Sequence, residues 1–141
     1  MPDIMPTKVN QIFVNLPVRD LPASMAFFRA LGFDFNPQFT DANAACLVLG
    51  ENFYAMLLVE DFFSGFSKLP VPDNAAGKEV LVALSVDSRA VVEDLVARAI
   101  AAGGTAPRPA QDHGFMYGHG FEDMDGHVWE FFHMSVMPDQ R

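Results

Sequence analysis

The chain has few cysteines and few basic residues, and each shortage excludes a class of protein. Cys46 is its one cysteine, so no disulfide can form within the chain, as is usual in a reducing compartment. Nine Lys and Arg stand against 18 Asp and Glu, which gives a net charge of −9. Because such a surface repels a phosphate backbone, we expect no nucleic-acid partner.

Long apolar runs are also missing. The longest, such as residues 54–59, are too short to cross a bilayer, and the start MPDIMPTKV has no basic region followed by an apolar stretch. We therefore expect a cytoplasmic protein with no membrane partner. The chain is instead rich in apolar side chains, because half of its 141 residues are hydrophobic and 14 are Phe. That content predicts one folded domain, residues 1–141.

The same order of elements occurs twice along the chain. In the first half, alternation, capping residues and turn residues predict a strand at 12–18, a helix capped by Asp20 and ended by Gly32, a strand at 33–35, and a hairpin of strands 44–49 and 53–59. In the second half they predict a strand at 80–86, a helix capped by Asp87 or Ser88 and ended by Gly103, a strand near 105–108, and a hairpin of strands 115–121 and 127–134 around Asp125-Gly126.

Each half thus reads as a βαβββ unit. The sequence predicts an α+β fold in which two tandem βαβββ modules, residues 8–60 and 80–134, form a curved mixed sheet around a central cavity. The linker 61–79 between them is rich in Phe, Pro and Gly. We favour the interpretation that it covers exposed sheet or takes part in a subunit contact, and the alternative is a lid over the cavity.

Glu130 is the candidate for chemistry. In the strand that follows the Asp125-Gly126 turn, it shares a face with Val128 and Phe132, because strand side chains alternate. A carboxylate among apolar neighbours needs hydrogen bonds or a cation, or its pKa is raised, so Glu130 suits a metal ligand or a general base. The alternative is a surface-facing or hydrogen-bonded glutamate.

These features resemble the vicinal oxygen chelate superfamily, which includes glyoxalase I, extradiol dioxygenases and bleomycin-resistance proteins. The resemblance rests on IFVNLPVRDLPASMAFFRALGF at 12–33 and on the stretch 81–132, with its AGG helix end and its acidic-Gly turn before Trp-Glu. More narrowly, the chain is similar to the bacterial group labelled glyoxalase-like or predicted lactoylglutathione lyase. Its turn reads Asp-Met-Asp-Gly, where the family usually has Asp-Pro-Asp-Gly.

The resemblance implies metal ligands on the first and last strand of each half. The matching positions are Phe13 and Met56 in the first half and Leu81 and Glu130 in the second. Only Glu130 can coordinate, so no cofactor is expected. If a divalent metal were bound, a rebuilt site would use Glu130, His119 and His113, with Tyr117 nearby.

We predict a ligand site in which Glu130 is the catalytic residue and the rest bind a small-molecule ligand. The predicted binding residues are Phe13, Asn15, Met56, Leu81, Ser85, Tyr117 and His119.

The resemblance and the residues leave three functions open. The first is a glyoxalase-like lyase or isomerase, or a dioxygenase. The second is a metal-free protein that binds and sequesters a small molecule, as in the bleomycin-resistance branch. The third is a metal-independent enzyme with Glu130 as base. We also expect a homodimer, because related proteins typically pair two-fold and edge strands would otherwise stay open.

Overall fold

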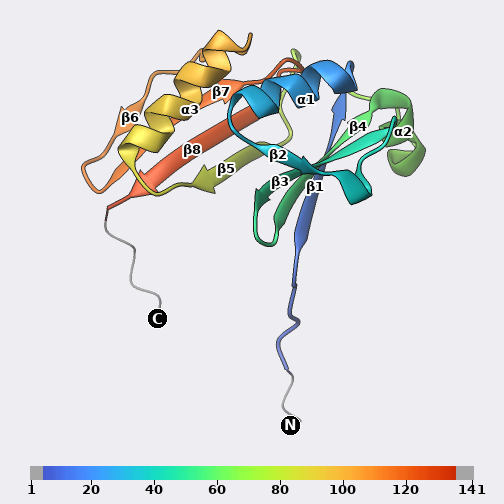
Figure 1. Ribbon diagram of the computed structural model, residues 1–141, viewed down its shortest axis with the longest axis horizontal. Coiled ribbons are helices and arrows are strands. Elements are labelled where there is room, and N and C mark those ends of the chain that lie inside the picture. Colours follow the sequence, from blue (N-terminus) through green and yellow to red (C-terminus); the bar gives the residue numbers. More distant parts are fainter. Residues whose placement is uncertain (1–4, 136–141) are drawn as a thin grey trace.

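The computed structural model describes residues 5–135, so the ends of the predicted domain, 1–4 and 136–141, lie outside the described residues. It contains two four-stranded mixed sheets and three α-helices, which confirms the predicted α+β fold (Figure 1). The first sheet has the order β1 (Ile12–Val18), β4 (Phe53–Val59), β3 (Ala44–Gly50) and β2 (Asp34–Asn36). The second has the order β5 (Leu81–Ser85), β8 (Val128–Met134), β7 (Met116–Glu122) and β6 (Gln111–Asp112).

Two helices form where the capping residues predict them. In α1 (Leu21–Ala30), the Asp20 side chain accepts a hydrogen bond from the Ala23 backbone N at 3.1 Å. In α3 (Arg89–Ala101), the Ser88 side chain accepts one from the Val91 backbone N at 3.2 Å. Each cap satisfies a backbone donor that the first helical turn cannot pair internally.

Both modules share one hydrophobic core. Helices α1 and α3 lie next to each other along the top of the molecule in Figure 1. The Phe28 ring meets the Trp129 ring of the second sheet with centroids 5.0 Å apart, and Phe27 meets Phe121 at 5.8 Å. Because one side of each sheet faces this common core, the other side of each sheet points away from it.

Three segments between the main elements differ from the sequence prediction. The strand predicted near 105–108 is wrong, since only Thr105 forms a bridge, to Glu122. Pro107 and Pro109 lack the N–H groups that would extend the pairing, and the short edge strand is β6 instead. The linker begins with a helix, α2 (Glu60–Ser67), which packs against β1 and β4. A one-turn 3-10 helix, Pro37–Phe39, precedes β3.

The predicted turn at Asp125-Gly126 joins β7 to β8. Gly126 has φ of 82°, which favours glycine, and its N–H donates to the Asp123 carbonyl at 3.1 Å. The Asp123 carboxylate accepts from the backbone N of His127 and from Trp129 Nε1 at 2.9 Å. Burial raises the pKa of Asp123 in spite of these hydrogen bonds. The turn is therefore anchored to the core through Trp129.

Among the described residues, no helix is long and apolar enough to cross a membrane.

Candidate functional site

The first sheet presents three predicted site residues on the side away from α1. Leu16 and Val18 of β1 are buried in the shared core, so Phe13 and Asn15 face the opposite side. Asn15 lies directly beside Met56 of β4 in the parallel ladder. This face is apolar, because Phe13 stacks on Tyr54 with ring centroids 4.7 Å apart.

The second sheet presents Leu81, Ser85 and Glu130 in equivalent places. In the parallel pair of β5 and β8, Leu81 lies beside Val128 and Ser85 beside Phe132. Glu130 shares their face, and the adjacent Trp129 points into the core with none of its surface exposed. Leu81 is 60% exposed, so this face is open in a single chain.

Tyr117 and His119 do not lie on this face, and placing them with Glu130 is wrong. In the antiparallel pair of β7 and β8, Gly120 lies opposite Glu130, whereas His119 lies opposite the core residue Phe131. The Tyr117 hydroxyl donates to Glu93 of α3 at 3.5 Å. The sequence could not fix this, because a one-residue change of register exchanges the two faces of a strand.

Glu130 belongs to a row of alternating charges. Arg108 Nε lies 3.6 Å from Glu130 Oε1, and Arg108 Nη1 lies 3.5 Å from Glu122 Oε2. Lys78 Nζ continues the row at 3.6 Å from Glu122 Oε1. A Cβ at Gly120 would meet Glu130 Oε2 at 2.5 Å, so the glycine leaves the space in which the carboxylate lies. Glu130 is therefore a partly exposed, ion-paired carboxylate beside a glycine, Gly120, on the open face of the second sheet.

These residues do not fit a divalent metal. Phe13, Met56 and Leu81 supply no suitable donor, and Glu130 already faces an arginine. His113 is exposed in the loop before β7, where its Nε2 lies 3.4 Å from Gln111 Oε1. In residues 5–135, no group of three or more His, Cys, Asp or Glu side chains is arranged to hold an ion.

Cys46 offers no nucleophile. It lies on β3 with none of its surface exposed, and burial raises the pKa of its thiol. A buried, protonated thiol behaves as a small apolar side chain.

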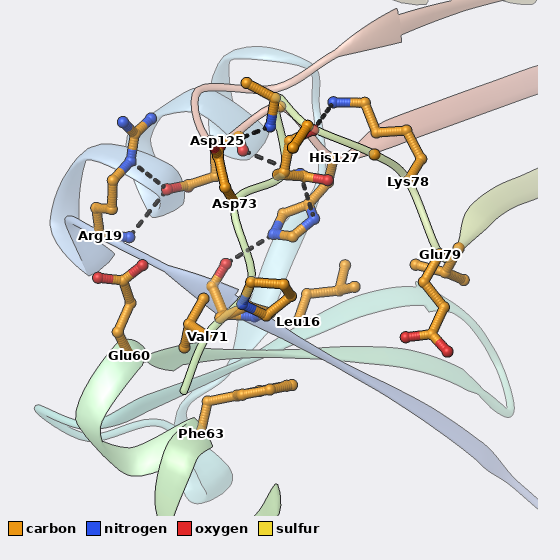
Figure 2. A pocket seen from close by; sticks show the side chains of 18 of the residues that line it. Leu16, Arg19, Glu60, Phe63, Val71, Asp73, Lys78, Glu79, Asp125 and His127 are labelled. Atoms are coloured by element: carbon orange, nitrogen blue, oxygen red, sulfur yellow. Dashed lines mark hydrogen bonds and ion pairs between the residues drawn. The ribbon is translucent and has the colours of Figure 1, made fainter. Parts of the chain in front are cut away.

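A cavity of about 1160 Å³ lies between the two modules (Figure 2). Its walls are β1, the start of α2, residues 71–80 and the β7–β8 turn. Of the predicted site residues, only Asn15 lines it. No local signal in the sequence identifies these lining residues, because they come from four separate segments and meet only in the folded chain.

His127 joins three of these walls. One ring nitrogen, Nε2, lies 2.7 Å from the Pro17 carbonyl oxygen of β1, and Nδ1 lies 3.2 Å from Asn74 Nδ2. Asn74 Nδ2 also donates to the Asp125 carbonyl at 3.1 Å. A neutral His127 with its proton on Nε2 satisfies both ring contacts, since Nδ1 then accepts from Asn74. This histidine therefore holds the walls together.

A smaller cavity of about 390 Å³ adjoins the large one. Asn15 and Phe63 line both, and Leu58, Phe66 and Ser67 complete the smaller space. It lies between α2 and the side of the first sheet that points away from the shared core, and its lining is mostly apolar.

Comparisons with known proteins agree with this architecture. Residues 11–50 match the family model described as bleomycin resistance protein-like N-terminal. A hypothetical protein from S. aureus is 29% identical, with a TM-score of 0.75 over 89% of this chain and 95% of its own. A glyoxalase-related enzyme from Fulvimarina pelagi is 24% identical, with a TM-score of 0.76 over 94% of both chains.

A bleomycin resistance determinant encoded on the transposon Tn5 is 19% identical and has the same fold, with a TM-score of 0.64 over 91% of this chain and 100% of its own. Comparison with curated protein sequences gave no match. The chain is thus a two-module βαβββ protein with the fold of the glyoxalase and bleomycin-resistance proteins. This fold is the one that the resemblance to the vicinal oxygen chelate superfamily implies.

Proposed function

We propose that this protein binds and sequesters a small, partly apolar molecule without using a metal. The observation that carries the proposal is the donor set at the four family positions. Three hold Phe13, Met56 and Leu81, and the fourth, Glu130, lies 3.6 Å from Arg108. These side chains suit contact with an organic ligand better than coordination of an ion.

We also propose that two copies of the chain form the complete site. The faces of the two sheets that point away from the shared core are open in one chain, apart from the part of the first that α2 covers. Phe13 is 42% exposed and Leu81 is 60% exposed, and each lies on a strand with a free edge. A second copy could set its second sheet opposite the first sheet of its partner, which would enclose a ligand between an apolar wall and the Glu130 wall.

The ligand class follows from these walls. The first contributes aromatic and apolar contact, and the second contributes Glu130, Arg108 and Glu122. A protein with a net charge of −9 attracts cations in general. The proposed ligand is therefore an organic molecule with an aromatic or apolar body and a cationic group, and bleomycin, the compound to which a structurally similar protein is a resistance determinant, is a suitable first probe.

The deciding experiment combines metal analysis with a binding measurement. Untagged protein, purified without chelator, should contain far less than one equivalent of Zn, Ni, Fe, Mn or Co per chain. Calorimetric titration with metal-free bleomycin should give the same affinity before and after dialysis against EDTA. A stoichiometric metal held by Glu130, together with lyase or dioxygenase turnover that EDTA abolishes, would contradict the proposal.

A second candidate is a metal-independent enzyme in which Glu130 moves a proton. It is favoured by the exposure of the Glu130 side chain, 34%, on an open face. The Glu130→Gln variant separates the two functions, because it keeps the shape of the side chain and removes its charge. Sequestration predicts a fall in affinity of about tenfold or more, equivalent to about 1.4 kcal/mol, with no turnover in either protein.

Analytical ultracentrifugation tests the dimer separately. A monomer at micromolar concentration, in the presence and absence of ligand, would contradict the two-chain site.

A further inference from the structure

Residues 71–80, which we call the strap, form one wall of the large cavity (Figure 2). All ten of them line it, and none of them is buried. At Gly77 an added Cβ would meet nothing within 4 Å. A segment without buried side chains is held by few contacts, so it separates from the rest of the fold more easily than core elements do.

Two side chains of the strap make polar contacts with the second module. Asn74 Nδ2 donates to the Asp125 carbonyl oxygen at 3.1 Å and lies 3.2 Å from His127 Nδ1. Lys78 Nζ lies 3.6 Å from Glu122 Oε1. In the part of the chain that the structure describes, no backbone hydrogen bond joins the strap to another element. The position of the strap therefore depends strongly on Asn74.

The contacts of His127 fix the position of the proton on its ring. The Pro17 carbonyl oxygen, 2.7 Å from Nε2, can only accept a hydrogen bond, so Nε2 carries a proton. The Asp125 carbonyl oxygen can also only accept, so the amide nitrogen of Asn74 faces it and directs its second N–H to His127 Nδ1. Nδ1 therefore accepts a hydrogen bond, and it can do so only while the ring is neutral.

Protonation of His127 removes this hydrogen bond. With a proton on Nδ1, the two nitrogens that lie 3.2 Å apart are both donors. A rotation that presents the Asn74 amide oxygen to Nδ1 takes the amide nitrogen away from the Asp125 carbonyl, so one hydrogen bond is lost in either case. The contact of Nε2 with Pro17 is unchanged, so the ring stays on β1 while the strap loses its attachment.

Charged groups surround His127 on the elements that pack against it. They are Arg19 after β1, Glu122 of β7, Asp123 and Asp125 of the turn, and Asp73 and Lys78 of the strap, with Glu60 of α2 and Glu79 in the wall of the same cavity. Arg19 lies 3.1 Å from Asp125, and Lys78 is paired with Glu122. Burial raises the pKa of Asp123, and the positive charge of a protonated His127 opposes that effect. The carboxylates outnumber the cations, so a protonated ring has counter-charges close by.

We propose that His127 is a pH-dependent switch that controls the strap. A neutral His127 holds Asn74 and keeps the strap against the turn, whereas a protonated His127 releases the strap and opens the large cavity to solvent. Histidine side chains change charge at about pH 5–8, so the strap responds to mild acidification. The switch concerns the wall of the large cavity and does not rest on the function proposed for the Glu130 face.

Nuclear magnetic resonance of the full chain between pH 5 and pH 7 tests the switch. At pH 7 the ring nitrogens of His127 should show a neutral ring with its proton on Nε2. As the ring titrates, the order parameters of the strap amides should fall from the rigid range, about 0.85, to below about 0.6, with the same midpoint. A proton on Nδ1 at pH 7, a ring that stays neutral down to pH 5, or a strap whose order does not change would overturn the proposal.

The variant His127→Gln separates this histidine from other titrating groups. Glutamine stays neutral, so the order parameters of the strap should no longer change between pH 5 and pH 7. The matched control is His113→Gln, which replaces an exposed histidine in the loop before β7 and should behave as the wild type does. Because Asp123 remains in His127→Gln, a strap that still loosens at low pH in this variant would assign the effect to Asp123 and refute the switch.

The variant Asn74→Asp reverses the requirement for charge while His127 stays in place. A carboxylate at this position accepts from a protonated Nδ1 and has no donor for a neutral one. The strap should therefore be more ordered at pH 5 than at pH 7, which is the opposite of the wild type. A purely structural role of Asn74 predicts no such reversal, so loosening at low pH in Asn74→Asp would contradict the proposal.

Discussion

The two modules repeat the same strands and helix but differ on the sheet faces that point away from the shared core. On the first sheet, Phe13 stacks on Tyr54, and Leu58 is 3% exposed beneath α2. On the second sheet, the position equivalent to Met56 holds Glu130, which pairs with Arg108 beside Gly120. One face is thus apolar and partly covered, and the other is charged and open.

This difference shows how a repeated fold can divide its tasks. The faces that meet in the shared core must both be apolar, whereas the faces that point away from it are under no such constraint. Each could therefore diverge, and the equivalent pair Met56 and Glu130 is the clearest result. Four predictions test how far the two faces, and the core behind them, depend on each other.

The largest effect is expected where the modules meet. Phe28→Ala removes a ring that is 1% exposed and packs on Trp129, so the free energy of unfolding should fall by about 3–5 kcal/mol. Urea unfolding followed by circular dichroism and by Trp129 fluorescence should show one shared transition. The control Phe13→Ala, on the face of the first sheet that points away from the core, should lower the free energy of unfolding much less. Separate transitions in the two signals would mean that the modules fold independently.

The next prediction concerns Gly120, on the open face of the second sheet. In Gly120→Ala, the new Cβ would meet the Trp129 carbonyl oxygen at 2.7 Å as well as Glu130, so the cost should be about 1–3 kcal/mol. The matched control is Gly118→Ala on the same strand and face, where the nearest atom is Phe132 Cβ at an ordinary 3.5 Å. Thermal melting of both variants checks this, and equal melting temperatures would contradict it.

Asp123 connects the β7–β8 turn to the core and gives a pH-dependent effect. Its folded pKa is raised from 3.8 by burial, so the folded chain holds the proton longer than the unfolded chain does. The contribution of Asp123 to stability is therefore fully present below about pH 4 and is lost as pH rises through the folded pKa.

The variant Asp123→Asn lacks this titration and loses the hydrogen bond from Trp129 Nε1, because an amide has only one acceptor oxygen, at a cost of about 1–3 kcal/mol. That cost should be larger at pH 4 than at pH 7. Urea unfolding of both proteins across this range measures it. A cost that grows toward pH 7 would show that the hydrogen bonds lower the pKa of Asp123 more than burial raises it.

The smallest effect is expected at the charged row. Arg108 is 45% exposed and its ion pairs are 3.5 and 3.6 Å long, so Arg108→Gln should change stability by less than about 1 kcal/mol. Added salt should reduce even that difference. The control Arg98→Gln removes the exposed pair with Asp94 on α3 and should behave alike. A loss above about 2 kcal/mol in Arg108→Gln alone would make Arg108 a structural residue of the second module.

The helix caps, the β7–β8 turn and the face of Glu130 could be predicted from the sequence because their signals are local. Asp20 and Ser88 cap their helices as predicted, and the Asp125-Gly126 pair forms the β7–β8 turn, since each depends on a few neighbouring residues. Alternation likewise put Glu130 on one face with Val128 and Phe132. The strand predicted near 105–108 did not form because Pro107 lacks an N–H donor, and the two-residue strand β6 carried too little signal to be predicted.

The sequence by itself determined the two βαβββ modules, the turn before Trp129, and the presence of the non-coordinating side chains Phe13, Met56 and Leu81. These depend on periodicity, capping and side-chain identity, all of which are local. Only the tertiary structure decided that Tyr117 and His119 face the core, because strand register is set by contacts between strands. It also decided that Glu130 meets Arg108 and that β1, α2, residues 71–80 and the β7–β8 turn enclose a cavity, because those segments are distant in the chain and meet only when both modules pack on one core.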